Sequence, residues 1–446
     1  MNNSTCILSL LLLFLLIGCE RQIGNDTIGN AYINGQWFDG SDFNKKTLYS
    51  VDGKLRSKTP QRIDTTIDLS GKFIIPPFAD AHTHNLDVEP NINEIEEQYL
   101  QEGTFYVQVL TNHTSKVDSL RGYFDRSSKL DVAYSNAGLT STGGHPFAAF
   151  EARALNLSWR AMIYEPEKIR DSRIGEGDSY WLLDTKEDVE NKWADIIATQ
   201  PDLIKIFLIN ADKHKELVEN GRLGDKGLSP EVAQLVTEKA HRSGLRVYAH
   251  VETAEDFRLG LNIGVDGFAH LPGYSWKGTG GNENYTLTDD DLEKAIEQDV
   301  VVIPTANFSK VYATQYKADG SFSLDSVKMD TVNTFLNNEL YRLLKKRIRI
   351  AVGSDQIGYT TSVELDHLNK YITSLTNEKL LTIATKTTPQ SIFPNRKVGE
   401  LKDGYEASFL VLNCNPLDNF YCTKEIKLRI KEGYELNYKI KPQKKN

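Results

Sequence analysis

The spacing of hydrophobic and polar positions along the chain changes near Phe73. Before Phe73, short stretches alternate apolar and polar side chains and carry turn signals at Asn34-Gly35 and Asp52-Gly53, a pattern that predicts β-hairpins. After Phe73, apolar runs of strand length alternate with longer stretches of helical spacing, which is typical of a parallel α/β architecture. Near the end of the chain the short-strand pattern returns, with a predicted hairpin turn at Glu432-Gly433.

The middle of the chain contains eight candidate strands. They cover residues 73–82, 104–110, 131–137, 203–209, 246–251, 267–271, 301–307 and 349–355. Eight strand and helix units within about 300 residues predict an α/β fold of the (β/α)8 or TIM-barrel type. The longest interval lies between the third and fourth strands, and its 173–180 part has the composition of a loop. Because loops that follow barrel strands lie on the catalytic face, this interval is a candidate lid or specificity element.

These patterns divide the chain into five segments. The β-rich ends are predicted to form one small β-sandwich-like domain beside the barrel. The predicted boundaries are 1–18 for a signal peptide, 19–30 for a tether, 31–72 and 389–446 for the two parts of the β domain, and 73–388 for the barrel.

The apolar run at residues 7–17 is too short to cross a bilayer but has the length of a signal-peptide core. It leads into Leu16-Ile17-Gly18-Cys19, which resembles the bacterial lipobox, where Cys19 would be lipidated and become the mature N-terminus. Residues 1–18 contain no Lys or Arg, unlike most signal peptides, so an uncleaved anchor is the alternative. Either interpretation predicts an exported protein held at a bacterial membrane, periplasmic or at the cell surface.

Composition narrows the classes of function. The chain has 446 residues, is 40% hydrophobic and 25% charged, and carries a net charge of −9 at pH 7, which favours a globular protein and argues against nucleic-acid binding. Of its four cysteines, Cys6 would be removed and Cys19 acylated. Cys414 and Cys422 remain, either as a disulfide or as free buried thiols.

The candidate chemistry begins with His82 and His84. Residues two apart in a strand point to the same face, so both rings are expected to face inward at the carboxyl end of the first barrel strand. Four more candidates lie in or just after other predicted strands: Lys205, His250, His270 and Asp355. Side chains from separate strand ends converge at the mouth of a barrel, and imidazole and carboxylate groups suit Zn²⁺. The pattern therefore predicts a two-metal site.

Lys205 is the unusual member of this set, because a charged ammonium would repel metal ions. Burial in an apolar strand would favour the neutral amine, which can combine with carbon dioxide to form a carbamate that bridges two cations. The alternative is a lysine on the outer face of the barrel with its amine in solvent.

The order of these motifs resembles the amidohydrolase superfamily with a binuclear centre and a carboxylated lysine. The resemblance extends to the segments IDLSGKFIIPPFADAHTH at 67–84, GSD at 353–355 and VGELKDGYEASFLVLNCNPLDN at 398–419. It implies that His82, His84 and Asp355 hold one metal, His250 and His270 the other, and carboxylated Lys205 bridges them.

A further motif narrows the branch of this superfamily. Thr142-Gly143-Gly144-His145 resembles the TGGH segment of imidazolonepropionase-related and prolidase-like members, in which the histidine faces substrate. Two glycines permit close backbone approach in a loop that folds over a ligand. Alternatively, His145 is a loop residue whose ring forms a hydrogen bond with the backbone. The other histidines, His113, His214, His241 and His367, are expected to have surface or packing roles, although the loop that carries His113 also opens on the catalytic face.

The resemblance implies that a hydroxide between two divalent metals, expected to be Zn²⁺, cleaves a C–N bond in a small amide, dipeptide-like or cyclic amide substrate. Asp355 would move a proton to the leaving nitrogen, and His145 would orient the substrate. One alternative is a mononuclear deaminase or imidazolonepropionase-like enzyme, which would not need Lys205. A second is a non-catalytic surface binding lipoprotein. Loops 273–276 and 305–308 are the expected specificity elements.

Overall fold

A computed structural model describes residues 28–87, 92–158, 161–316 and 321–437. The predicted signal peptide, Cys19 and most of the predicted tether lie outside the described residues. Within the described ranges, no helix combines the length and the apolar character needed to cross a bilayer.

The central strands are parallel and form two sheets. The three-stranded sheet has the order β6-β7-β8, and the seven-stranded sheet has the order β10-β9-β11-β12-β13-β14-β17. Their bounds are β6 Phe78–Thr83, β7 Thr104–Val109, β8 Asp131–Tyr134, β9 Gly138–Thr140, β10 Tyr180–Leu182, β11 Ile204–Phe207, β12 Val247–His250, β13 Gly267–Ala269, β14 Val301–Ile303 and β17 Arg349–Ile350. Each predicted barrel strand therefore overlaps a strand of these two sheets.

Backbone hydrogen bonds also join the two sheets where β6 meets the segment after β17. The Ala81 amide donates to the Val352 carbonyl at 2.8 Å, and the Asp355 amide donates to the His82 carbonyl at 2.7 Å. The fold is thus a mixed α/β fold with parallel sheets, and a single closed eight-stranded barrel stays a prediction. These bonds fix Asp355 beside His82, although the two residues are far apart in the sequence.

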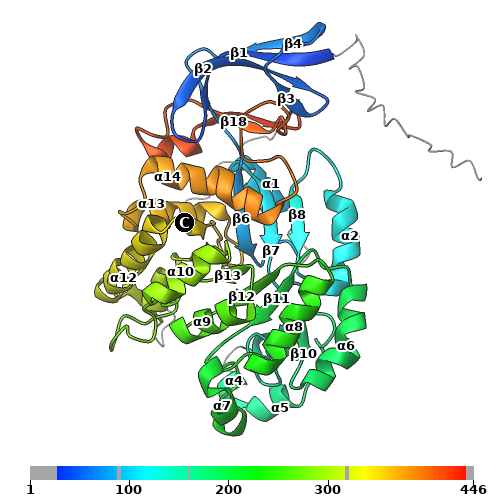
Figure 1. Cartoon of the computed structure of the whole chain (residues 1–446), viewed down its shortest axis with the longest axis vertical. Helices are drawn as coiled ribbons and strands as arrows, with labels where there is room; N and C mark the ends of the chain where they lie inside the picture. The colour runs from blue at the N-terminus through cyan, green and yellow to red at the C-terminus, as the bar shows by residue number, and fades with distance from the viewer. Residues whose placement is uncertain (1–27, 88–91, 159–160, 317–320, 438–446) are drawn as a thin grey trace, which may run out of the picture.

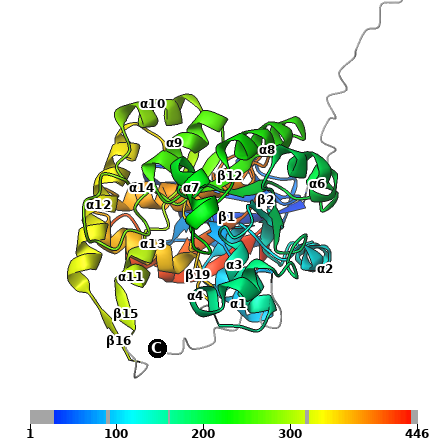
Figure 2. The same ribbon diagram turned by 90° about the horizontal axis from the view of Figure 1, so that it is seen from below.

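Helices surround the strands in the view from below (Figure 2). Their bounds are α1 Ile92–Gln101, α2 Thr114–Phe124, α3 Phe147–Ala154, α4 Ala161–Tyr164, α5 Pro166–Arg170, α6 Lys186–Ala198, α7 His214–Asn220, α8 Pro230–Arg242, α9 Ala254–Ile263, α10 Asp289–Glu297, α11 Phe308–Ala313, α12 Ser326–Lys345, α13 Thr361–Tyr371, α14 Asn377–Thr382 and α15 Thr388–Ile392. Three short helical elements and one antiparallel hairpin complete this list. The helical elements are η1 Ala211–Lys213, η2 Ile383–Thr387 and η3 Phe420–Lys424, and the hairpin consists of β15 Thr314–Tyr316 and β16 Phe322–Leu324.

Helix α8 illustrates why these segments form helices. Ser229 caps its first turn by accepting from the Val232 amide, and Pro230 occupies the first turn, where a missing N–H costs nothing. Val232, Val236 and Ala240 recur at four-residue spacing and are buried, so one face of the helix packs on the strands. The fold thereby keeps the strand ends in place beneath their loops.

The interval predicted as an insertion contains α3, α4, α5 and strand β10. Strand β10 pairs in parallel with β9, so this interval is anchored to the seven-stranded sheet. Its 173–180 part remains largely a loop, and the side chain of Asp178 ties that loop to the segment after β7. A lid function for this interval stays a prediction.

Strands from both ends of the chain share one eight-stranded sheet, seen at the top of Figure 1. Its order is β20-β19-β18-β5-β1-β2-β3, with β4 paired to β1. The bounds are β1 Ile28–Phe38, β2 Phe43–Val51, β3 Lys54–Arg56, β4 Arg62–Asp68, β5 Phe73–Ile75, β18 Phe409–Leu412, β19 Ile426–Lys431 and β20 Tyr434–Glu435. The described strands from the two ends pair into one sheet, and a sandwich-like arrangement of this end domain stays a prediction.

Two of the three predicted turns in this sheet are confirmed. Asp52-Gly53 joins β2 to β3 and Glu432-Gly433 joins β19 to β20, with positive φ at all four residues. The predicted turn at Asn34-Gly35 is wrong, because these residues lie inside β1, at a register shift. Asn34 has a φ of 64°, a conformation that suits a bulge as well as a turn. The chain instead turns after Asp39, whose side chain accepts from the Asp42 amide at 2.9 Å.

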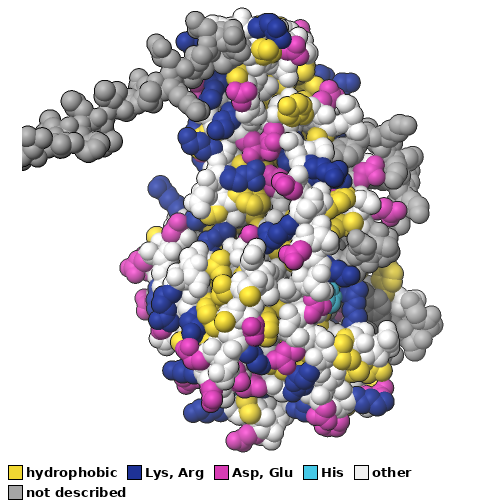
Figure 3. Space-filling model, turned by 90° about the vertical axis from the view of Figure 1, so that its right-hand side faces the viewer, with side chains coloured by type: hydrophobic (Ala, Val, Ile, Leu, Met, Phe, Trp, Pro, Cys, Tyr) yellow, Lys and Arg dark blue, Asp and Glu magenta, His cyan; other side chains and the backbone are white. Residues whose placement is uncertain are grey.

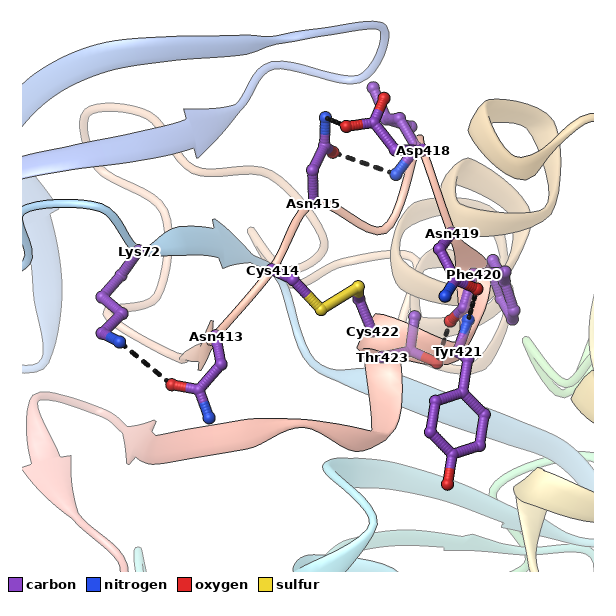
Figure 4. Close-up of a disulfide and its surroundings, with 11 residues drawn as sticks. Lys72, Asn413, Cys414, Asn415, Asp418, Asn419, Phe420, Tyr421, Cys422 and Thr423 are labelled. Carbon is purple, nitrogen blue, oxygen red and sulfur yellow. Dashed lines mark hydrogen bonds between the residues drawn. A yellow bond between two sulfur atoms is a disulfide. The ribbon is translucent and has the colours of Figure 1, made fainter.

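Cys414 and Cys422 form a disulfide with a Cα–Cα distance of 5.4 Å (Figure 4). The bond closes the loop between β18 and β19, the strand pair that brings the C-terminal part of the chain onto β5. Since β5 leads directly into β6, the end sheet supports the strand that carries His82. On the outer face shown in Figure 3, the described Lys and Arg side chains are interspersed with Asp and Glu.

Candidate metal centre

The structure places His82 and His84 at the carboxyl end of β6, as the spacing predicted. All six residues of β6 are buried, and the His82 side chain is 1% exposed, while His84, just past the strand, is 29% exposed. Both rings point their Nε2 atoms at Oδ1 of Asp355, at 3.1 Å from His82 and 3.0 Å from His84. One carboxylate oxygen thus faces two imidazoles from a neighbouring strand.

His250 and His270 form a second group, at the ends of β12 and β13. Nδ1 of His250 lies 3.0 Å from Nε2 of His270. On its other side, Nδ1 of His270 is 2.7 Å from the Thr305 hydroxyl. The Tyr274 ring stacks on the His270 ring with centroids 3.9 Å apart, so the orientation of this imidazole is fixed from two directions.

Lys205 points from the middle of β11 into the same region and is 1% exposed. Its Nζ makes no hydrogen bond within the described structure. Burial lowers the pKa of the Lys205 amine to about 7, against a smaller raising effect from Asp355. A large share of the amine is therefore uncharged near neutral pH, the form that reacts with carbon dioxide.

The charge states of three of the four histidines also favour a cation. Burial and the neighbouring Lys205 lower the pKa of His82 and His250 well below the ordinary value. Burial, followed by His250 and His82, does the same for His270. Burial also lowers the pKa of His84, but the hydrogen bond and charge of Asp355 outweigh it and raise the value overall. Neutral imidazoles keep the lone pair that a metal needs.

The distances within both groups fit divalent metals. A tetrahedral zinc ion with ligands about 2.0–2.1 Å away separates two ligand atoms by about 3.3 Å. The corresponding separations here are 3.0 and 3.1 Å in the His82, His84 and Asp355 group and 3.0 Å between His250 and His270. One ligand atom each of His82, His270 and Asp355 lies within 4.8 Å of the others, so the two groups are contiguous. The donor set therefore suits metal binding.

His145 lies beside this centre rather than in it. Its ring centroid is 4.9 Å from that of His250 and 5.3 Å from that of Phe207. Burial, followed by the neighbouring His250, lowers its pKa to about 3, so the imidazole is neutral. The loop is held by the His145 amide, which donates to the Lys226 carbonyl at 2.8 Å. A Cβ at Gly144 would lie 2.7 Å from that carbonyl oxygen, which explains the glycine.

A cavity of about 760 Å³ opens over the centre, a volume suited to a small molecule. All seven predicted site residues line it: His82, His84, His145, Lys205, His250, His270 and Asp355. The two loops expected to set specificity contribute Tyr274 and Phe308. The structure thus brings the predicted set together in one place.

Other lining residues were not predicted. They include Asn85, Asp87, Ile95, Phe150, Arg153, Tyr312 and Ile357. Asp87 lies in the loop after β6 and Ile357 in the loop after β17. The sequence pattern could therefore have indicated both residues as candidates. Arg153 and Tyr312 lie on short helices, where a polar or aromatic residue carries no mark of the cavity it faces.

His113 was expected to have a surface or packing role, in a loop that opens on the catalytic face. The structure places it on the cavity wall, since the loop after β7 opens on the same side as His84. Its Nδ1 lies 3.0 Å from Oδ2 of Asp178 and 2.8 Å from the Ser179 hydroxyl. The hydrogen bond that the His113 ring makes to the Asp178 carboxylate raises the pKa of His113 despite its partial burial. His113 therefore links the inserted segment to the cavity.

No protein-family model matches the chain, and no curated protein matches it either. Solved structures do share its fold. An ochratoxinase from A. niger aligns at 17% identity with a TM-score of 0.67, covering 91% of this chain and 95% of its own. A Xaa-Pro dipeptidase with bound methionine in its active site aligns at 16% identity with a TM-score of 0.67, covering 91% and 99%. A molinate hydrolase aligns at 16% identity with a TM-score of 0.64, covering 92% and 94%.

Proposed function

We propose that this chain is a metal-dependent hydrolase of the amidohydrolase type that cleaves a C–N bond in a small amide, including dipeptide-like and cyclic amides. The observation that carries the proposal is the convergence of six candidate ligands, from or just after five parallel strands, beneath one cavity. Neighbouring ligand atoms of the four histidines and Asp355 are 3.0–3.1 Å apart. The fold shared with a Xaa-Pro dipeptidase, an ochratoxinase and a molinate hydrolase supports it.

In this proposal, His82, His84 and Asp355 would hold one divalent metal and His250 and His270 would hold the other, with Zn²⁺ expected in both. Lys205 would add carbon dioxide at Nζ and release a proton, and the resulting carbamate anion would serve as a further ligand. When bound, the metals polarise the substrate carbonyl and lower the pKa of water toward about 7.

The chain's own residues then position and move protons. The Asp355 carboxylate accepts the proton of the attacking water and donates it to the leaving nitrogen, so that an acid and an amine are released. Neutral His145 donates a hydrogen bond to the substrate. The rings of Phe207 and Tyr274 line the cavity and restrict water around the reacting carbonyl.

We also propose that the protein is exported and held at a bacterial membrane by a lipid on Cys19. The disulfide between Cys414 and Cys422 supports an oxidising compartment. Metabolic labelling with a radioactive fatty acid tests this: the full chain is expected to incorporate label, and the Cys19→Ala variant to lose it. Equal labelling of the two proteins would contradict the anchor.

Metal analysis and an amide screen test the enzyme. Protein produced with zinc and bicarbonate is expected to hold about two metal equivalents and to hydrolyse at least one compound among dipeptides, N-acyl amino acids and lactams. Lys205→Ala is expected to lose metal and activity, while Lys215→Ala, an exposed lysine, serves as the control. Unchanged metal content and activity in Lys205→Ala would favour the mononuclear alternative. Absence of both metal and hydrolysis in the unmodified protein would favour a binding lipoprotein.

A further inference from the structure

Arg153 places a positive charge on the cavity wall. It lies in α3 and is the one arginine among the described residues that line the cavity. The one lysine in that lining, Lys205, is buried among the candidate metal ligands. Within the described parts of the chain, the Arg153 side chain makes no ion pair and no hydrogen bond, and it is exposed.

Several other cations of the same interval, between β8 and β11, have acidic partners. Lys168 pairs with Glu165, Arg173 approaches Glu176 at 3.9 Å, and Lys192 pairs with Glu176 at 2.5 Å. These pairs lie away from the cavity, whereas Arg153 lines it. An arginine on a concave surface with no acidic partner among the described residues is available to a ligand.

The surroundings of Arg153 indicate what that ligand contains. Asp87 and His113 lie on the same wall, and the positive charge of Arg153 acts on both. The Asp87 oxygen Oδ2 already accepts from the His113 amide at 3.2 Å, and Asp87 is 5% exposed. Asp87 is thus a largely buried part of the wall, whereas Arg153 is exposed. The planar set of donors of its guanidinium matches a carboxylate in a bidentate arrangement.

Apolar residues border the same charge. Ala149 and Phe150 precede Arg153 by one helical turn and share its face of α3. Across the cavity, the lining includes Ile95, Phe308 and Ile357. A ligand that fills this space therefore meets apolar surface together with one cation.

We propose that Arg153 binds a free carboxylate of the substrate, so that the enzyme selects small amides that carry a carboxylate beside an apolar side chain. This inference rests on the proposed function and adds the charge of the substrate to it. Arg153 then determines specificity through binding and takes no part in the proton transfers.

A matched pair of probes tests this, N-acetyl-L-leucine and its neutral primary amide, N-acetyl-L-leucinamide. Binding to the zinc-loaded protein is measured by calorimetry, and hydrolysis of the N-acetyl bond is followed in parallel. The unmodified protein is expected to bind the acid at least about 10-fold more tightly than the amide, because a charged hydrogen bond contributes about 1.5–3 kcal/mol, or about 10- to 100-fold. Arg153→Met is expected to remove that preference and raise KM for the acid with little change in kcat. Arg153→Lys is expected to restore part of it.

Arg126→Met is the control, because Arg126 is exposed and does not line the cavity. Equal affinity of the unmodified protein for acid and amide, or an unchanged preference in Arg153→Met, would overturn the role of Arg153. Hydrolysis without charge preference would leave the proposed function standing. The acid could also bind more tightly than the amide, in a way that depends on Arg153, while no amide in the screen is hydrolysed. That result would support carboxylate binding by Arg153 and count against the proposed function.

Discussion

The hydrogen bonds of the Thr305 hydroxyl determine which ring nitrogen of His270 keeps its lone pair. Its oxygen lies 2.7 Å from Nδ1 of His270 and 2.8 Å from the Pro304 carbonyl, and a hydroxyl has only one proton to donate. Because the carbonyl can only accept, that proton goes to Pro304, and Thr305 accepts the Nδ1 proton of His270. The lone pair of His270 therefore lies on Nε2, the atom that faces His250.

Thr305→Val should weaken metal binding, because it removes this acceptor while keeping a similar shape. Loss of a hydrogen bond behind a metal-bound histidine reduces affinity by about 10- to 100-fold. Zinc affinity is measured by competition with a chromophoric chelator. Thr305→Ser keeps the hydroxyl and is expected to bind zinc nearly as tightly as the unmodified protein. Equal affinity in Thr305→Val would mean that the tautomer of His270 does not depend on Thr305.

Lys205 should make the stability of the metal-free protein depend on pH. Its pKa is lowered from 10.5 to about 7 by burial, so between these values the unfolded chain binds a proton that the folded chain does not. Stability therefore rises with pH from about 7 toward 10.5. Lys205→Met removes this group, and its urea unfolding free energy should rise less, between pH 7 and pH 9, than that of the unmodified protein.

This comparison is made after treatment with a chelator and without bicarbonate, so that neither metal nor carbamate formation contributes. Lys215→Met, at an exposed position, is the control and should follow the unmodified protein. Parallel pH profiles for all three proteins would show that the Lys205 amine keeps an ordinary pKa in the folded chain.

The sequence predicted that the candidate ligands lie together, because each lies in or just after a strand, and parallel strands bring their carboxyl ends to one side. His82, Lys205 and Asp355 could be assigned in this way without any knowledge of distances. Arg153 and Glu364 could not be predicted, because both lie on helices, where a charged residue usually faces solvent. The bulge at Asn34 was missed for a related reason, since the same left-handed conformation serves a turn and a bulge.

Glu364 is such a helical residue, and its carboxylate accepts several buried hydrogen bonds close to the site. It is fully buried in α13 and accepts from the Ala306 and Asn307 amides at 2.8 Å each and from Nδ2 of Asn307 at 2.7 Å. Asn307 in turn donates to the Ser354 carbonyl at 3.1 Å, next to Asp355. Glu364 thus joins the loop after β14, which carries Thr305, to the loop that carries Asp355.

Glu364→Ala should destabilise the protein by about 2–5 kcal/mol, because buried N–H donors lose their acceptor. Chemical unfolding measures this loss. Asp366→Ala, on the same helix, removes only a surface ion pair with Lys424 and should cost less than about 1 kcal/mol. A similar small effect for both variants would contradict the bracing role of Glu364. The metal content of folded Glu364→Ala should also fall, since both adjoining loops carry groups of the site.

The disulfide between Cys414 and Cys422 should contribute to the stability of the end sheet. The two cysteines are eight positions apart, and closing a loop of that size stabilises a folded chain by about 2–3 kcal/mol through the unfolded state. The double variant Cys414→Ala, Cys422→Ala is expected to lose that amount in urea unfolding. Reduction of the unmodified protein should give a similar loss, and reductant should leave the double variant unchanged. Because neither cysteine lines the cavity, zinc content should stay the same in the folded variant. A loss of zinc would instead show that the end sheet controls the position of β6 and its histidines.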